Sequence, residues 1–443
     1  MQQPSTGSRS DSQIRLETIE RPPEAAPHYP PIRPSRARHK LLYWALVVLA
    51  LCGSFPLGAY LALKEVGQQP FSSTSGVTWL TPIPTPTLTP EQRQAQFIAQ
   101  TISRMSLDEE LGQLLVVAFT GTTLSSNLQT MIVNQHVGGI ILFASNIKTF
   151  AQVQALDAAM QARASIPLFI STDQEGGQVN RLRAIIGNTP SALDMGATND
   201  PAFAQQQGQK DGQILGQLGI NLDFAPVVDV QAGGFVPSVL ATRMFGTTPD
   251  KVTTFAGAFL QGLQSQGVLG TIKHWPGLGS TPVDPHQDLP TLYRSQADLN
   301  AIDFAPYRNL LQQGQINMVM VTHEVLPAYD PTKPASLSPI MVDQVLRHDL
   351  GYQGVVITDS LYMGALTKRW TIAQEGLLAV QAGDDLLLGI STPSDVQKIV
   401  DGLRAAISNG TISKARIDQS VTRILTLKIK AGLITMPAGL AQP

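Results

Sequence analysis

The stretch VLGTIKHWPGLGSTPVDPH, residues 268–286, joins an apolar run to a polar loop, and this order recurs along the chain. Residues 268–272 have the composition of a short buried strand, and the glycines and prolines after them prevent a strand or a helix from continuing. Two histidines, a lysine and an aspartate lie between Lys273 and His286. Because barrel enzymes hold their chemistry in loops at the carboxyl ends of strands, this loop is a candidate active-site segment.

Similar apolar runs alternate with segments of helical length from residue 91 onward. There are eight, at residues 114–119, 137–143, 168–172, 222–230, 268–272, 318–322, 354–358 and 385–388. Eight strands that alternate with helices predict an α/β fold, a (β/α)8 barrel of the TIM type, over residues 91–436. The order Thr89-Pro90-Glu91 predicts the start of a helix, and Ser106 with Glu109 predicts a capping box at the start of a second one.

The chain before the barrel divides into three predicted parts. Residues 1–40 are rich in proline and poor in large apolar side chains, which predicts a disordered tail. Residues 41–63 carry no charge and can cross a bilayer as one helix at about 1.5 Å per residue. Residues 64–90 are rich in Pro, Thr and Ser, which predicts an extended linker. Four basic residues within 33–40 precede the apolar segment, so we expect a single-pass protein of the cell membrane, with a cytoplasmic tail and an extracytoplasmic barrel.

Two other interpretations of residues 41–63 stay open. A cleaved signal peptide has an apolar core of roughly 7–15 residues after a short basic segment, whereas about 40 residues precede this one. A lipoprotein signal would end at Cys52, but Leu51 stands where a small residue is required. Cys52 is the single cysteine, which excludes an internal disulfide.

The composition excludes some classes of partner. The formal net charge is -2, with 31 basic and 33 acidic residues, which argues against a nucleic-acid-binding surface. The histidines do not have the spacing of metal ligands, so no metal and no cofactor are predicted. The oligomeric state does not follow from the sequence.

Three motifs resemble those of glycoside hydrolase family 3, in particular its β-N-acetylglucosaminidase branch, over roughly residues 95–430. Residues 273–286 are similar to the family's Lys-His-Phe-Pro-Gly-His-Gly, a spacer and Asp-Ser-His, but Leu278 replaces the second His and Pro285 replaces Ser. Residues 358–363, Thr-Asp-Ser-Leu-Tyr-Met, resemble the nucleophile motif Thr/Ser-Asp-Asp/Ser-Leu-x-Met, whose fifth position varies. Residues 173–181 resemble Asp-Gln-Glu-Gly-Gly-x-Val-x-Arg.

The resemblance implies a role for eight residues. Asp359, which follows four β-branched residues at a predicted strand end, would be the nucleophile of a retaining glycosidase. His286 would be the general acid and base, with Asp284 as its partner, because a histidine beside a carboxylate can donate a proton near neutral pH. The sugar would be bound by Asp173, Arg181, Arg243, Lys273 and His274.

Three further residues have a structural alternative. Glu175 is expected to form an ion pair with Arg181 rather than to contact sugar. His323 and Glu324 close the sixth predicted strand, where they would either line the site or serve the fold.

The implied function is that of a retaining exo-β-N-acetylglucosaminidase. Its carbohydrate substrate would be terminal β-linked N-acetylhexosamine on cell-wall fragments or chito-oligosaccharides, which implies a role in peptidoglycan turnover. The alternatives are a β-glucosidase or xylosidase, a glycoside phosphorylase of the same family, and a catalytically degenerate sugar-binding barrel. Leu278 and Pro285 motivate the last of these, since proline restricts its own φ and the backbone of Asp284.

Overall fold

The computed structural model describes residues 88–233, 240–281 and 283–437. Within these ranges, no helix is both long enough and apolar enough to cross a membrane. The predicted tail, the predicted span at residues 41–63 and nearly all of the predicted linker lie outside the described residues, and they stay predictions.

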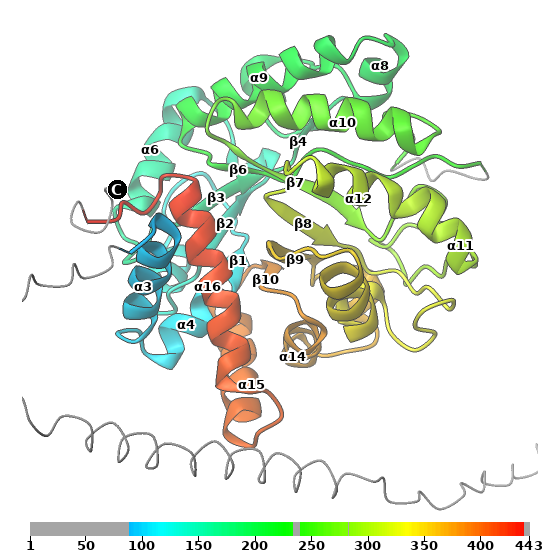
Figure 1. The fold of residues 1–443 in the computed structure, drawn as a ribbon. Coiled ribbons are helices and arrows are strands. Elements are labelled where there is room, and N and C mark those ends of the chain that lie inside the picture. The colour runs from blue at the N-terminus through cyan, green and yellow to red at the C-terminus, as the bar shows by residue number, and fades with distance from the viewer. Residues whose placement is uncertain (1–87, 234–239, 282, 438–443) are drawn as a thin grey trace, which may run out of the picture. The chain divides into compact units, whose positions relative to one another are not determined.

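Eight parallel strands close into the predicted barrel, in the order β1-β10-β9-β8-β7-β6-β3-β2 around it (Figure 1). The strands are β1 (Leu115–Val117), β2 (Gly139–Leu142), β3 (Phe169–Thr172), β6 (Leu222–Asp223), β7 (Leu269–Trp275), β8 (Met318–Val321), β9 (Val355–Ser360) and β10 (Leu386–Ile390). Each lies within or overlaps one of the eight apolar runs. A short antiparallel hairpin, β4 (Gln174–Gly176) and β5 (Val179–Asn180), follows β3.

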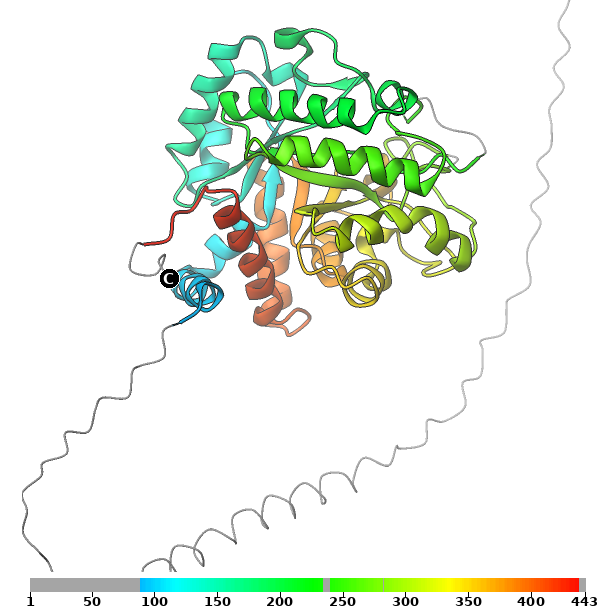
Figure 2. The same ribbon diagram turned by 45° about the horizontal axis from the view of Figure 1, so that its top comes forward.

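Helices cover the outside of the barrel (Figure 1). The longer ones are α3 (Pro90–Ile102), α4 (Leu107–Gln113), α5 (Ser126–Val133), α6 (Phe150–Gln161), α9 (Pro201–Leu218), α10 (Pro249–Gln264), α12 (Ala305–Gln312), η4 (Ile340–Asp349), α14 (Ile372–Ala382), α15 (Pro393–Ser408) and α16 (Lys414–Lys430). The shorter ones are η1 (Ala144–Asn146), α7 (Arg183–Ile186), α8 (Ala192–Ala197), α11 (Gln296–Asp298), η2 (Leu299–Asp303), η3 (Ala335–Leu337) and α13 (Gly364–Thr367). Helices α9 and α10 run side by side (Figure 2), and α16 packs against α3 and α4.

The predicted helix starts are confirmed by their capping contacts. Thr89 exchanges hydrogen bonds with Gln92 at the start of α3, and Ser106 does the same with Glu109 at the start of α4. These side chains pair backbone N–H groups that a helix leaves without an internal partner. Proline in the first turn of α9, α10 and α15 suits the same position, because proline has no N–H to pair.

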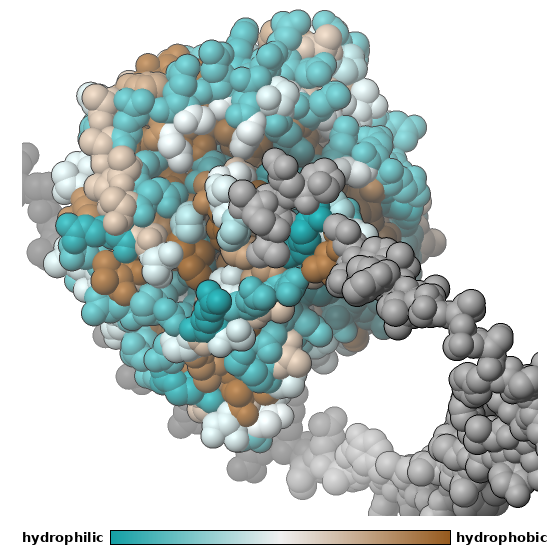
Figure 3. Space-filling view, turned by 60° about the vertical axis from the view of Figure 1, so that its left-hand side comes forward, coloured by the Kyte–Doolittle hydropathy of each residue, from teal (hydrophilic) through white to brown (hydrophobic). Residues whose placement is uncertain are grey.

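The strands form the centre of the hydrophobic core. Every residue of β1, β2, β3, β7, β8 and β10 is buried, as expected for a parallel sheet that is covered on both faces. Strand β9 becomes accessible only at its last two residues, Asp359 and Ser360. The outer face drawn in Figure 3 is largely hydrophilic outside the grey atoms, with its hydrophobic residues in small separate groups.

Two strands end more than two residues away from their predicted ends. Strand β7 does not end at residue 272, because Trp275 is buried against the rings of Phe304 and Tyr307, with ring centroids 4.6 and 5.0 Å away. This packing keeps Lys273 and His274 in the strand. The run at residues 222–230 forms regular strand only as β6; beyond Pro226, which has no N–H for the ladder, pairing with β7 resumes as a single bridge between Val227 and Lys273.

Candidate active site

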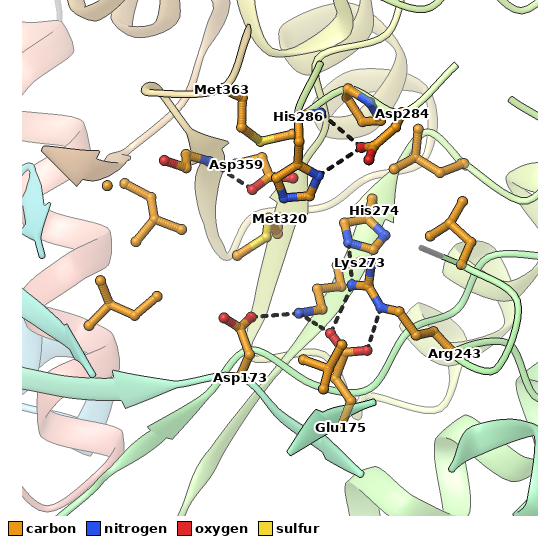
Figure 4. A pocket seen from close by; sticks show the side chains of 18 of the residues that line it. Asp173, Glu175, Arg243, Lys273, His274, Asp284, His286, Met320, Asp359 and Met363 are labelled. Atoms are coloured by element: carbon orange, nitrogen blue, oxygen red, sulfur yellow. Dashed lines mark hydrogen bonds and ion pairs between the residues drawn. The ribbon is translucent and has the colours of Figure 1, made fainter. Parts of the chain in front are cut away.

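A cavity of about 470 Å³ opens where the carboxyl ends of the barrel strands meet (Figure 4). Its volume is within the range of small-molecule sites, roughly 300–1,000 Å³. Its lining includes all eight residues for which the family resemblance implied a role: Asp173, Arg181, Arg243, Lys273, His274, Asp284, His286 and Asp359. The described residues contain no group of three His, Cys, Asp or Glu side chains placed to hold a metal ion. The fold therefore brings together residues that are up to 186 positions apart in the chain.

Asp359 lies near the end of β9, with its carboxylate in the cavity (Figure 4). Its Oδ1 accepts a hydrogen bond from the backbone N–H of Ser360 at 2.7 Å. Removal from bulk water would raise the pKa of Asp359, but the positive charge that His274, His323 and His286 carry when protonated, together with the Ser360 N–H, outweighs this effect and holds the pKa below its ordinary value. The carboxylate is therefore charged at neutral pH, as a nucleophile must be.

His286 and Asp284 form a hydrogen-bonded pair at the mouth of the cavity. Oδ1 of Asp284 lies 2.8 Å from Nδ1 of His286 and also accepts the backbone N–H of His286 at 2.9 Å. A carboxylate only accepts, so Nδ1 carries the proton and Nε2 is the ring nitrogen left for proton exchange. Pro285 does not disturb this pair. It occupies the second position of a turn in which the Gln287 N–H binds the Asp284 carbonyl, and proline suits that position.

The loop that carries His286 is bound to the segment that follows Asp359. The N–H of Gly364 donates to the carbonyl of His286 at 3.1 Å, and the N–H of Ala365 donates to that of Pro285 at 3.2 Å. A Cβ at position 364 would lie 2.6 Å from the carbonyl oxygen of Gln287, so only glycine permits this approach. Backbone contacts thus set the position of the His286 loop relative to the segment that carries Asp359.

Buried ion pairs centred on Glu175 form the floor of the cavity (Figure 4). Arg243 binds Glu175 through Nε at 2.7 Å and through Nη2 at 2.8 Å, while Nζ of Lys273 lies 2.6 Å from Glu175 and 2.7 Å from Asp173. Burial would raise the pKa of Glu175, but the charges of Arg243 and Lys273 outweigh it and hold the pKa far below its usual range. Glu175 is therefore an ionised anchor for two cations.

The expected pair of Glu175 with Arg181 is wrong. Arg181 lies on the segment after the hairpin, where Nη2 approaches Asp173 at 3.4 Å and the guanidinium lies 5.6 Å from the ring centroid of Phe143. It is partly exposed, whereas Glu175 lies deeper and is already bound by two other cations. Arg181 therefore lies at the side of the cavity with Asp173.

Asp229 holds His274 in place, and the sequence analysis missed it. Its Oδ2 lies 2.7 Å from Nδ1 of His274, and its Oδ1 accepts the backbone N–H groups of His274 and Leu278. Nε2 of His274 lies 3.1 Å from Nη2 of Arg243, which can only donate, so the neutral ring carries its proton on Nδ1. The available signal was an acidic residue near the end of the run 222–230, comparable to Asp359 after its own apolar run.

Leu278 fills an apolar space beside the cavity. It is buried with Val227, Leu240 and Met244 in a cluster separate from the main core. Its backbone N–H is bound by Asp229, so the turn after β7 is held without a polar side chain at this position. The departure from the family motif thus exchanges a polar contact for apolar packing.

His323 and Glu324 are buried, and neither lines the cavity. Nε2 of His323 lies 2.9 Å from the carbonyl oxygen of Ser360, to which it must donate, and Nδ1 lies 2.7 Å from Oγ of Ser336. Burial lowers the pKa of His323 and keeps its ring neutral. His323 therefore supports the peptide that follows Asp359 and does not face the cavity.

Comparisons with known proteins agree with these motifs. A family model described as the glycosyl hydrolase family 3 N terminal domain matches residues 106–427. The chain is 35% identical to beta-hexosaminidase LpqI of Mycobacterium tuberculosis over 391 residues, covering 87% of this chain and 94% of LpqI. A solved structure of LpqI has a TM-score of 0.69 at 34% identity, over 75% of this chain and 96% of that one. A family 3 beta-N-acetylglucosaminidase from Paenibacillus sp. str. FPU-7 has a TM-score of 0.72 at 36% identity, over 76% of this chain and 65% of that one.

Proposed function

This chain belongs to glycosyl hydrolase family 3, and we propose that it is an exo-acting, retaining β-N-acetylglucosaminidase. The observation that carries the proposal is that Asp359 and the Asp284–His286 pair line one cavity (Figure 4) and that His286 is near enough to Asp359 to influence its pKa. The preference for N-acetylglucosamine is supported by the name of the beta-N-acetylglucosaminidase at 36% identity, and the name of the relative at 35% identity, a beta-hexosaminidase, agrees with a hexosamine substrate.

In the first step, the carboxylate of Asp359 attacks the anomeric carbon while the protonated ring of His286 gives its Nε2 proton to the glycosidic oxygen. The bond to the leaving group breaks, and a covalent glycosyl-Asp359 forms. In the second step, Nε2 of neutral His286 takes a proton from water as the water attacks the anomeric carbon, which releases the sugar with its β-configuration and restores Asp359. The negative charge of Asp284 stabilises the imidazolium that is present before the first step and after the second.

The floor of the cavity supports exo action. Glu175 is ion-paired with both Lys273 and Arg243, and all three side chains are buried, so the closed floor admits the end of a sugar chain rather than its middle. Lys273, Asp173 and Arg181 offer charged donors and acceptors to its hydroxyl groups. The proposed substrates are terminal N-acetylglucosamine residues of cell-wall fragments or chito-oligosaccharides outside the membrane. The barrel meets them there if residues 41–63 span the membrane as predicted.

The test compares release of nitrophenol from the β-N-acetylglucosaminide and from the β-glucoside by the purified protein. The N-acetylglucosaminide should react far faster, and NMR should show the β-anomer as the first product. Equal rates or a preference for glucose would favour the β-glucosidase alternative, and sugar binding without turnover would favour a degenerate barrel. Formation of sugar 1-phosphate in added phosphate would instead identify a phosphorylase.

A further inference from the structure

We propose that the ring of Tyr362 is a binding surface for the leaving sugar, so that the protein favours substrates whose leaving group is a pyranose. This inference rests on the proposed function. Tyr362 occupies the variable position of the nucleophile motif, three residues after Asp359, and it lines the cavity. It is therefore a feature of this chain rather than of the shared motif.

The side chain of Tyr362 is exposed, whereas the residues on either side of it in the sequence are buried. It is 38% exposed, whereas Leu361 and Met363 on either side are buried. Its hydroxyl donates to Oδ2 of Asp395 at 2.6 Å and accepts the backbone N–H of Ser391 at 3.4 Å. Because the hydroxyl is already hydrogen-bonded, a ligand meets the aromatic ring rather than a free hydroxyl group.

The ring is held from both ends. The backbone of Tyr362 follows β9, while Asp395 lies in the first turn of α15, after β10. Asp395 is itself held, because its Oδ1 accepts from Nζ of Lys398 at 2.7 Å and its Oδ2 from Oγ1 of Thr392 at 3.0 Å. The ring thus loses little conformational freedom when a ligand binds, which favours its use as a binding surface.

Tyr362 is on the leaving side of the scissile bond. His286 protonates the glycosidic oxygen, so the leaving group must lie next to His286. The loop of His286 is bound through backbone contacts to Gly364 and Ala365, two and three residues beyond Tyr362. By contrast, the side chains of Lys273 and Glu175 on the floor are only 2% and 4% exposed, and they suit the sugar that is transferred to Asp359.

A pyranose ring fits this surface chemically. The C–H groups on one face of a β-linked N-acetylglucosamine are apolar, and they can cover an aromatic ring while the hydroxyl groups stay in water. Contacts to a part of the substrate that does not react can raise kcat/KM for substrates that carry it. A leaving group without a ring makes no such contact.

The experiment compares N,N′-diacetylchitobiose, whose leaving group is a pyranose, with N-acetylglucosaminyl β-fluoride, whose leaving group is a single ion. Tyr362→Ala should lower kcat/KM for the disaccharide about tenfold, a typical effect of removing one well-packed aromatic contact. It should change kcat/KM for the fluoride by less than about twofold. Tyr362→Phe keeps the ring and should preserve the ratio of the two values within about threefold. Tyr293→Ala is the matched control, because Tyr293 is 84% exposed and does not line the cavity.

The outcomes separate this inference from the function on which it rests. Both substrates are measured on one preparation of each variant, so a smaller fraction of folded protein cancels in the ratio of the two kcat/KM values. If Tyr362→Ala does not fold, Tyr362→Leu takes its place. An equal loss on both substrates, or no loss on either, would show that the ring does not bind the leaving sugar. If the parent protein turns over neither substrate, the proposed function itself is wrong.

Discussion

Replacing Asp284 with asparagine is expected to lower kcat/KM for N,N′-diacetylchitobiose about tenfold. Asparagine keeps an oxygen for Nδ1 of His286, now 2.8 Å away, and for the backbone N–H at 2.9 Å, but it loses the charge. A hydrogen bond to a charged group contributes about 1.5–3 kcal/mol and a neutral one about 0.5–1.5 kcal/mol. The lower limits of these two ranges differ by about 1 kcal/mol and the upper limits by about 1.5 kcal/mol. The side chains of His286 and Asp284 are 60% and 20% exposed, so solvent screens the pair and a loss larger than this is not expected. At 1.36 kcal/mol per decade, this is about tenfold.

The assay measures kcat and kcat/KM with the disaccharide and with the nitrophenyl N-acetylglucosaminide. Nitrophenolate leaves without a proton, so kcat/KM for the nitrophenyl substrate should change by less than about twofold, while kcat should fall for both because water still needs a base. In a His286→Ala background, Asp284→Asn should have almost no further effect, because Asp284 acts through His286. Equal losses of kcat/KM on the two substrates, or full additivity of the two mutations, would refute the proposed pairing.

Three further predictions test other parts of the structure. A 2-fluoro sugar should label Asp359, and Asp359→Ala should lose several orders of magnitude of activity; mass spectrometry that finds the label on another carboxylate would contradict the assignment. His323→Gln keeps a donor for the Ser360 carbonyl, so its kcat should be about tenfold higher than that of His323→Leu when the two variants have the same thermal stability. Equal kcat values for the two variants would exclude this positioning role of His323. Burial lowers the pKa of Lys428, whose Nζ donates to Gln113, to about 7 from the ordinary 10.5. Between pH 7 and pH 10.5 the unfolded chain binds a proton that the folded chain does not, so the destabilisation by Lys428 decreases as pH rises. The unfolding free energy gained by Lys428→Met, measured in urea, should therefore be about 2 kcal/mol larger at pH 7 than at pH 9. Equal gains at the two pH values would disprove the lowered pKa of Lys428.

The barrel and the position of the reacting groups could be predicted from the order of residues. Each apolar run is long enough for one strand, and each is followed by a segment of helical length, so the closed parallel arrangement follows from general packing rules. Lys273 and Asp359 lie within the last three residues of a strand and Asp173 lies just beyond one, and in a parallel barrel the carboxyl ends of all strands meet at one face. Local sequence therefore determined which side chains reach the cavity.

The ends of the strands were decided by tertiary packing. Nothing within residues 268–276 shows that the strand continues to Trp275, because the rings that bury this side chain come from Phe304 and Tyr307. Helix starts were predictable for the opposite reason. A cap such as Ser106 and its partner Glu109 are three residues apart, so the whole contact is contained in the local sequence.

The choice of charge partners was also decided by the tertiary structure. Glu175 was expected to pair with Arg181, six residues away, but it binds Arg243, 68 residues away. Asp229, which orients His274 from 45 residues away, was not identified at all. The energy of an ion pair depends on the distance between the two charges and on their exclusion from water, and in a barrel both are set by which strands are neighbours. The sequence by itself determined that Asp173, Lys273 and Asp359 lie near the ends of strands, and the closure of the barrel decided which charged groups at that face pair with each other.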